Sequence, residues 1–411
     1  MEGGAFTPIA LNIMSKYDRN TTIEKAVFNV DLKLWTLFNS TFDRIQQSPG
    51  SEIESISMVY YYLVANNSFV DITCRGETFM TLNGYSFRQS VIYLRANKFS
   101  NFVMGTQTSM IQVLKCNAFE YKHNNVVNVT GYGSILLLRK LDQMWYCSVR
   151  SNTIQQLNGT GIISAEGDSI NTITIEHNNF TSNYFLTNGI DISVVLNNGK
   201  ITYFNNTFSH NILKLTNETL YHNYNFLSIT AKLAIEGQNT LFDSSVFSNN
   251  TLISNPGATQ YGYSYGFLSF QIANSSIDFH NITFEHNSLT DNNLKALFFI
   301  GESVSISACN FTNNTKNSTE GFIFMYAYNI SIVDSYFGHL NDTHGKGAID
   351  IATTAYLKYL CKVNITNNTF ENIVAKSGSV LTANGILDMV FHLTRPLNMD
   401  TVMLICSGLK D

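Results

Sequence analysis

Residues 276–314 read SIDFHNITFEHNSLTDNNLKALFFIGESVSISACNFTNN, and this stretch contains one pattern twice. Each half has alternating apolar residues, then a phenylalanine, then an asparagine three residues later: Phe284 precedes Asn287, and Phe311 precedes Asn314. Such alternation indicates a β-strand with one buried face. Because a short strand cannot bury that face alone, its repetition predicts coils that stack into a solenoid.

The same phenylalanine recurs along most of the chain. From Phe180 onward, successive copies lie 26 to 39 residues apart. This spacing suits coils with loops of variable length better than a rigid short repeat. The series consists of Phe42, Phe69, Phe99, Phe119, Phe180, Phe208, Phe247, Phe284, Phe311, Phe337 and Phe370.

We therefore expect an all-β chain that forms one right-handed parallel β-helix, a β-solenoid of about a dozen coils. At about 4.8 Å per coil, the rod would be on the order of 55–60 Å long. Residues 1–383 would form this single domain, with less regular coils over 39–152 and the clearest coils over 161–383. Residues 384–411 lose the pattern, and Pro396 would interrupt a sheet, so we expect an irregular cap or a truncated end there.

A β-sandwich is the competing all-β fold, but it predicts hairpins at intervals of about 8–12 residues and not a period of coil length. The chain has only four prolines. Its turns must therefore depend on asparagine and glycine, which tolerate left-handed backbone angles. Asparagines at equivalent turns can also form side-chain amide ladders between coils.

The composition limits the possible functions. Apolar residues make up 44% of the chain, charged residues only 13%, and the net charge is −5. Thinly spread negative charge argues against a nucleic-acid partner, which requires clustered Lys and Arg. No apolar run is long enough for a transmembrane helix. Six widely spaced cysteines, without a CxxC pair, favour small buried thiols over a zinc site or a disulfide framework.

Asparagine residues also create 18 Asn-x-Ser/Thr sequons, roughly twice the number that the composition gives by chance. One explanation is a heavily N-glycosylated extracellular surface; the other is that ladder asparagines followed by strand-favouring threonines produce sequons incidentally. Strand alternation predicts that Asn206 and Asn368 point inward. The same alternation predicts an outward position for five candidate glycosylation sites: Asn179, Asn205, Asn281, Asn310 and Asn367.

The first residues, Met-Glu-Gly-Gly-Ala-Phe, lack the basic and apolar regions of a signal peptide. Two interpretations follow: a cytosolic protein, or a fragment whose signal peptide and anchor lie outside this sequence. Because the residues at 3–6 look like the middle of a repeat, and because sequons are abundant, we favour an extracellular or cell-surface location.

The repeated Phe-x-x-Asn, with Gly-Gly-Ala-Ile-type strands, resembles the β-helical passenger regions of polymorphic outer-membrane proteins. It is also similar to the right-handed β-helix (pectin-lyase-like) surface proteins of protists. The resemblance implies a surface-exposed protein with an adhesive or structural role. Most repeats here lack the second glycine. The matching segments are Phe180–Asn183, Phe208–Asn211, Phe247–Asn250, Phe284–Asn287 and Phe311–Asn314, with Gly3–Phe6 and Gly347–Ile349.

The same fold carries polysaccharide lyases and hydrolases, which need two carboxylates held several ångströms apart. Asp191, Asp278 and Asp350 lie in strand-like segments but at different places in their coils. His210, His286 and His339 share one coil position, but Asn249 and Asn313 occupy it in the intervening coils. The sequence therefore predicts no catalytic, metal-binding or cofactor-binding residue.

The sequence thus favours a non-enzymatic, structural or adhesive β-helix region of a larger cell-surface protein. Glycans or other surface proteins are the partners that this interpretation suggests. The alternative is a carbohydrate-active lyase or hydrolase on the same scaffold, and clustered carboxylates in one groove would favour it.

Overall fold

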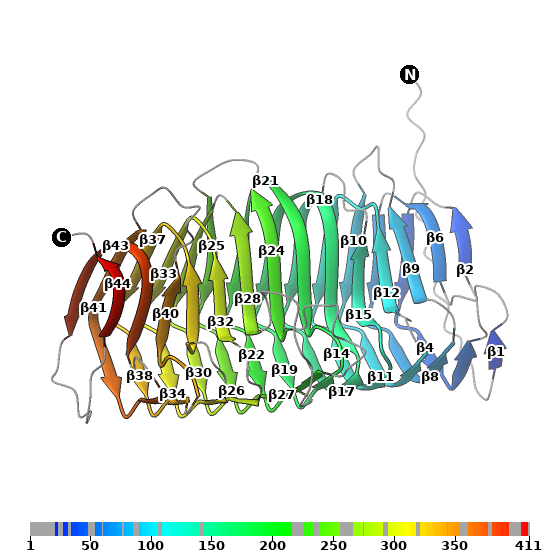
Figure 1. The fold of residues 1–411 in the computed structure, drawn as a ribbon. Coiled ribbons are helices and arrows are strands. Elements are labelled where there is room, and N and C mark those ends of the chain that lie inside the picture. Colours follow the sequence, from blue (N-terminus) through cyan, green and yellow to red (C-terminus); the bar gives the residue numbers. More distant parts are fainter. Residues whose placement is uncertain are drawn as a thin grey trace, which may run out of the picture.

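The computed structural model shows an elongated β-solenoid, built from parallel strands that stack from coil to coil (Figure 1). No helix occurs among the residues that it describes. Each circuit of the chain visits four strand ladders in turn. The described residues are 21–23, 28–31, 34–47, 54–59, 61–75, 78–84, 90–105, 109–139, 144–215, 225–233, 238–254, 266–273, 275–290, 295–317, 321–342, 344–352, 361–376, 380–393 and 404–409.

The first ladder forms one long face of the rod, and its strands lie in the upper part of Figure 1 together with those of the second ladder. Strands β18, β21 and β43 are long and bend into the second ladder. The members of the first ladder are β2 (Phe28–Asp31), β6 (Glu54–Val59), β9 (Thr78–Gly84), β12 (Ser109–Leu114), β15 (Ser134–Arg139), β18 (Gly161–Glu176), β21 (Ile190–Phe204), β24 (Leu227–Leu233), β28 (Gly266–Ala273), β32 (Lys295–Ile300), β36 (Ile323–Tyr326), β40 (Ile349–Ala352), β43 (Leu381–Leu393) and β44 (Leu404–Leu409).

The second ladder continues directly from the first and contains the C-terminal halves of those three long strands. Its other members are β3 (Leu34–Phe38), β7 (Tyr61–Ala65), β10 (Val91–Arg95), β13 (Ala118–Lys122), β16 (Met144–Arg150), β25 (Gln238–Asp243), β29 (Ser275–His280), β33 (Ser303–Ser307), β37 (Asn329–Val333) and β41 (Cys361–Glu371).

The third ladder carries the repeated phenylalanine, and the fourth closes the coil. Strand β41 bends from the second ladder into the third, and β8, β11, β14 and β17 bend from the third into the fourth. The third ladder contains β4 (Thr41–Asp43), β8 (Ser68–Cys74), β11 (Lys98–Met104), β14 (Asn125–Thr130), β17 (Thr153–Gly159), β19 (Asn179–Thr181), β22 (Thr207–Ser209), β26 (Val246–Ser248), β30 (Thr283–Glu285), β34 (Asn310–Thr312) and β38 (Tyr336–Gly338). The fourth contains β1 (Thr21–Ile23), β5 (Ile45–Gln47), β20 (Tyr184–Phe185), β23 (Ile212–Leu215), β27 (Thr251–Ser254), β31 (Ser288–Thr290), β35 (Thr315–Asn317), β39 (Asn341–Asp342) and β42 (Val374–Ala375).

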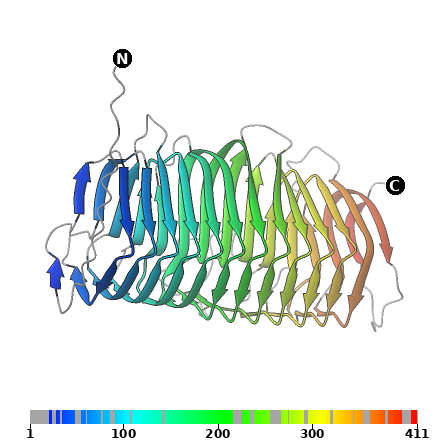
Figure 2. The ribbon, with the colours of Figure 1, turned by 180° about the vertical axis from the view of Figure 1, so that it is seen from behind.

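The view from behind shows these layers running without interruption from the blue to the red end of the rod (Figure 2). The parallel β-solenoid expected from the repeat is therefore confirmed. Its right-handedness and the number of coils stay predictions. The segment 3–6, which the resemblance used, lies outside the described residues.

Ten of the eleven repeated phenylalanines stack in register in the third ladder. Phe42 and Phe69 have ring centroids 4.9 Å apart, and Phe337 and Phe370 are 4.8 Å apart. Each such pair contributes about 0.5–1.5 kcal/mol beyond its buried area. The assignment of Phe119 to this series was wrong, because Phe119 pairs with Ile92 and Cys147 in the second ladder. Val126 and Ile154 occupy the third-ladder positions in that region, so apolar character, and not the ring, defines the site.

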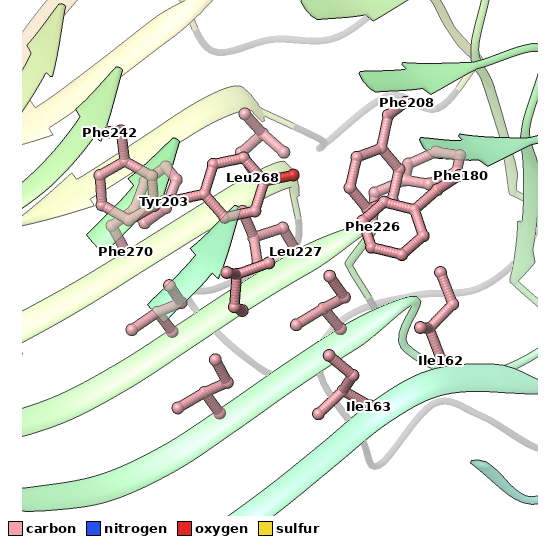
Figure 3. Close-up of a cluster of buried hydrophobic side chains, with 14 of the residues drawn as sticks. Ile162, Ile163, Phe180, Tyr203, Phe208, Phe226, Leu227, Phe242, Leu268 and Phe270 are labelled. Atoms are coloured by element: carbon pink, nitrogen blue, oxygen red, sulfur yellow. The ribbon is translucent and has the colours of Figure 1, made fainter. Parts of the chain in front are cut away.

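Aromatic side chains also cluster in the interior, both within one ladder and between ladders (Figure 3). Phe180 and Phe208 are 4.6 Å apart between ring centroids, and Phe226 lies on the same side of the cluster. Phe242 and Phe270 approach to 4.4 Å. Because stacked strands are about 4.8 Å apart, equivalent rings in adjacent coils come into contact automatically.

Two asparagine ladders stabilise the corners. In each, an asparagine Nδ2 donates both to the Oδ1 of the equivalent residue in the next coil and to a carbonyl of the preceding coil. The amide–amide distances are 2.9 to 3.2 Å, and every member is buried. The ladder at the corner between the second and third strand ladders (corner A) consists of Asn67, Asn97, Asn124, Asn152, Asn178 and Asn206. The ladder at the corner between the third and fourth (corner B) consists of Asn183, Asn211, Asn250, Asn287 and Asn314.

Each corner also contains one exposed or half-exposed residue with a left-handed backbone. None of these residues is a glycine, so the expected dependence on glycine was wrong here, although asparagine is frequent. At corner A they are Asn39, Asn66, Ala96, His123, Ser151, His177, Asn205, Ser244, Asn281, Ala308, Asp334 and Asn367. At corner B they are Arg44, Asp71, Asn101, Asn128, Gln156, Ser182, His210, Asn249, His286, Asn313, His339 and Asn372.

Glycines before the first-ladder strands serve a different purpose, which is close approach between coils. A Cβ on Gly189 would lie 2.6 Å from the carbonyl oxygen of Phe226 in the next coil. A Cβ on Gly161 would lie 2.4 Å from the carbonyl oxygen of Asn188. Both distances are too short for a side chain.

The C-terminal segment for which an irregular cap was expected contains most of β43 and all of β44, and the pairing of these two strands has a register shift. Strand β43 continues to Leu393, and β44 pairs with it in parallel. The alternation that explains this is Asp388, Val390 and His392, all exposed, with Met389 and Phe391 between them in sequence and Leu387 before them. These residues lack the Phe-x-x-Asn pattern but keep the period of two that a strand requires.

Candidate ligand-binding groove

An open groove with a volume of about 600 Å³ lies on the outer face of the first ladder, over β15, β18, β21 and β24. Strand alternation supplies its floor, because every second residue of these strands points outward. The sequences Ser164-Ala-Glu166, Asp191-Ile-Ser193 and Ser228-Ile-Thr230 are three such alternating segments. The residues that line the groove are Ser134, Arg139, Ile163, Ser164, Thr187, Asn188, Asp191, Ser193, Ser228 and Thr230.

Register places the polar side chains of this floor side by side. Asp191 pairs with Ser164 on one side and with Ser228 on the other. Ser193 and Thr230, which form the next row, are paired and exposed. The arrangement offers polar side chains at intervals of about 4.8 Å, the spacing of adjacent strands.

Asp191 is the carboxylate of the groove and is half-buried. Burial raises the pKa of Asp191, although hydrogen bonds from Asn188 and Ser228 oppose this shift. The Oδ1 of Asn188 accepts a hydrogen bond of 2.6 Å from the backbone N–H of Asn225 in the next coil. The Asn188 side chain is thereby held against both Asp191 and the neighbouring coil.

Thr187 contributes an enclosed hydroxyl at the edge of the groove. Its Oγ1 makes no hydrogen bond within the described part of the chain. The corner that carries Thr187 and Asn188 lies against Gly161, because a Cβ there would meet Thr187 Oγ1 at 3.1 Å. The glycine thus allows the corner to form one wall of the groove.

A second carboxylate, Glu166, lies on the same outer face one coil away. Glu166 pairs with Ser193, two residues beyond Asp191, so the two acidic residues are diagonal neighbours. One step between strands and two residues along a strand separate their backbones by about 8 Å. Glu166 is exposed and lies outside the residues that line the groove.

The two other aspartates considered in the sequence, Asp278 and Asp350, lie in different ladders. Asp278 lies in β29 of the second ladder. Asp350 lies in β40, in the same outward row as Asp191, with Ser228, Ser269, Phe298 and Phe324 aligned between them. The expectation that all three occupy different coil positions was therefore wrong for Asp191 and Asp350. Asp350 is buried, and its Oδ2 lies 3.0 Å from Lys346 Nζ.

The three histidines singled out in the sequence occupy one row at corner B, with Asn249 and Asn313 between them, as predicted. His210, His286 and His339 are all exposed and have left-handed backbones. Within the described ranges, no three His, Cys, Asp or Glu side chains are grouped in a way that could hold a metal ion.

Four of the five candidate glycosylation residues are exposed: Asn179, Asn205, Asn281 and Asn367. Asn310 is half-buried, and its Oδ1 is enclosed without a hydrogen-bond partner in the described structure. The inward positions predicted for Asn206 and Asn368 are confirmed, with exposed fractions of 1% each. Simple strand alternation is not why they point inward. Asn205 and Asn367, which precede them, have left-handed backbones at the corner, and this turn directs the next residue into the core.

The cysteines with described side chains are buried free thiols. Burial raises the pKa of Cys147 and Cys309 to about 12 and that of Cys361 to about 11. Cys309 occupies the ladder position of corner A, where its Sγ contacts the carbonyl oxygens of Phe279 and Ser307 at 3.4 and 3.2 Å. These thiols pack and donate weak hydrogen bonds; at neutral pH they are protonated and poorly nucleophilic.

Sequence reasoning missed most of the groove. Arg139, Ser164, Ser193 and Thr230 belong to no motif, and their common property is an outward position in adjacent first-ladder strands. The signal available was a polar residue at every second position after a glycine, as in Gly189-Ile-Asp-Ile-Ser193.

Among the described residues, no helix has the length and apolar character needed to cross a membrane. In comparisons with known proteins, no protein-family model matches the chain, and no curated protein matches it in sequence.

Proposed function

We propose that this chain is a non-enzymatic, structural or adhesive segment of a cell-surface protein, and that its groove binds a glycan. The observation that carries the proposal is the groove over β15, β18, β21 and β24, lined by hydroxyl and amide groups on a rigid rod. Such groups match the hydroxyl-rich surface of a saccharide, and a scaffold of stacked strands holds them in fixed positions.

The adhesive part of the proposal is supported by how the groove is built. Arg139 and Asp191 supply one charge of each sign, and the remaining polar lining residues are neutral. A neutral or weakly charged oligosaccharide fits this lining better than a polyanion. Contacts repeated from coil to coil suit an extended chain that lies across the strands.

The test is binding of the purified chain to immobilised oligosaccharides and polysaccharides. Ser193→Tyr would fill the groove from an exposed outward position and should weaken binding at least about tenfold. Thr174→Tyr is the matched control, because Thr174 lies farther along β18 in the second ladder, outside the groove. Equal binding by both variants, at wild-type strength, would exclude the groove as the binding site.

A carbohydrate-active lyase or hydrolase is the second candidate, and the Asp191–Glu166 pair favours it. Inverting glycosidases hold two carboxyl groups about 6.5–9.5 Å apart, and the acid of such a pair has a raised pKa. Release of reducing ends or unsaturated products from a polysaccharide, abolished by both Asp191→Asn and Glu166→Gln, would establish this activity. Undiminished binding without product formation would favour the adhesive role.

A further inference from the structure

The buried asparagines of the two amide ladders and the asparagines that begin sequons are different residues in this solenoid. None of the buried asparagines in the two amide ladders begins an Asn-x-Ser/Thr sequon. The reason is geometric, because the residue two positions after a ladder asparagine faces the core and is apolar in most coils. Incidental sequon formation by the ladder asparagines therefore does not explain the abundance of sequons.

The sequons instead begin at exposed residues. Every sequon asparagine that the structure describes is exposed, with Asn310 as the exception. The clearest group lies at corner A, where five sequons occupy one identical coil position. Their asparagines are Asn39, Asn66, Asn205, Asn281 and Asn367.

The local geometry at these five corners is the same. The asparagine is exposed and has a left-handed backbone, with φ between 50° and 57°. The next residue points into the core, as Asn206 does after Asn205. The Ser or Thr that completes the sequon lies in a third-ladder strand and is exposed or half-exposed, as Thr207 is. The acceptor amide and the hydroxyl thus lie on one accessible edge.

We propose that these five asparagines form a row of N-glycosylation acceptors along one edge of the rod. The inference rests on the proposed cell-surface role, which requires passage through a secretory compartment. In the reaction, the asparagine Nδ2 attacks the anomeric carbon of a lipid-diphosphate-linked oligosaccharide. An N–C bond forms, the C–O bond to the diphosphate breaks, the lipid diphosphate leaves, and the amide loses one proton.

A second row has the same properties at corner B. Asn128, Asn249 and Asn313 are exposed, have left-handed backbones and begin sequons. Asn310 differs from all of these because it lies within β34, with its side-chain oxygen enclosed. The folded structure therefore accommodates a glycan at either corner but must rearrange locally to carry one at Asn310.

The arrangement also separates the glycans from the groove. Among the described residues of the first ladder, no asparagine begins a sequon. Corners A and B lie at the ends of the third-ladder strands, whereas the groove lies over the first-ladder strands β15 to β24. The two features are thus compatible in a single molecule.

The experiment is to express the chain behind a signal peptide in eukaryotic cells and map occupancy by mass spectrometry. Glycosidase release in heavy-oxygen water converts each modified asparagine to a labelled aspartate. We expect modification at the corner A residues and little or none at Asn310. Thr207→Ala should remove the glycan from Asn205 alone, and Thr207→Ser should keep it. Unmodified corner A asparagines in the secreted protein would overturn the inference.

Translation into microsomes gives the same readout if the chain is not secreted, because acceptor use there does not require export. Glycan binding by unglycosylated protein from bacteria tests the proposed function separately. Binding without corner modification would refute the acceptor row and leave the adhesive role standing. Corner modification without glycan binding would support the acceptor row and refute the proposed binding of a glycan in the groove.

Discussion

Tyr121 and Tyr203 carry buried hydroxyl groups that make no hydrogen bond within the described structure. Each phenol lies in the core, and an unpaired buried hydroxyl costs about 1–3 kcal/mol. We therefore expect Tyr121→Phe and Tyr203→Phe to raise the free energy of unfolding by about 1 kcal/mol, measured by urea denaturation. Tyr336→Phe is the control, because its hydroxyl donates to Glu371 Oε2 at 2.9 Å. A loss of stability in the first two variants, as in the control, would show that their hydroxyls have partners.

Titration of Asp191 makes the free energy of unfolding depend on pH. Because burial raises its pKa in the folded state, the folded chain retains a proton over a pH range in which the unfolded chain has lost it. This contribution to stability is fully present below the ordinary Asp pKa and is lost as the pH rises through the raised pKa. Asp191→Asn should therefore stabilise the protein at about pH 7 and have little effect near about pH 3.

The measurement is the free energy of unfolding of both proteins in urea over that pH range. Glu166→Gln serves as the control, because Glu166 is an exposed carboxylate on the neighbouring strand. A lower stability of Asp191→Asn at neutral pH would mean that the charged carboxylate is favoured by its hydrogen bonds, contrary to the sign of the shift.

At the scale of the element, the amide ladders join the same corner of successive coils by hydrogen bonds. Asn178 is 2% exposed, and its Nδ2 donates to Val149 O and Asn206 Oδ1 at 2.9 Å each. Its Oδ1 accepts from both the backbone and the side chain of Asn152. Asn178→Leu should lower the free energy of unfolding by about 3 kcal/mol or more, since several buried groups lose their partners.

Asn178→Ser is the informative comparison, because serine occupies the equivalent position naturally. Ser245 Oγ accepts from the backbone N–H of Asn206 at 3.0 Å. The serine variant should therefore lose less stability than the leucine variant when both are unfolded in urea. Equal losses would indicate that side-chain volume, and not hydrogen bonding, determines the stability of the corner.

The strand pattern explains how much of these elements could be predicted. Alternation and the Phe-x-x-Asn repeat correctly placed ten phenylalanines on a buried face and Asn206 and Asn368 inside, since a period of two leaves few alternatives. Phe119 was misplaced because one coil contains several apolar strands, and spacing alone does not say which ladder a phenylalanine enters. Lys316 could not be foreseen inside the core, where its Nζ lies 3.1 Å from Asp342 Oδ2. A buried ion pair depends on register between residues far apart in sequence.

The groove was harder to predict for a related reason, now at the scale of the whole molecule. Arg139, Asp191 and Ser228 come from three coils, and loops of different length separate them in sequence. Their proximity follows from the register of the first ladder, which the sequence does not encode in any local motif. The rod itself was predictable because one repeated unit, stacked many times, determines its shape.

The stacking of coils makes a final prediction about the whole molecule, because each coil contacts only its neighbours. Phe208, within the rod, packs between Phe180 and Phe247 at 4.6 and 5.5 Å. Phe370, near the C-terminal coils, contacts Phe337 at 4.8 Å. Replacing either with alanine removes a similar buried volume, at a cost of about 3–5 kcal/mol.

Native-state hydrogen exchange should nevertheless differ between them: Phe370→Ala should accelerate exchange in β38, β41 and β43, with the distant coils unaffected. Phe208→Ala should lower protection in coils on both sides, since the defect divides the solenoid. Uniform acceleration in both variants would instead show that the rod unfolds as a single cooperative unit.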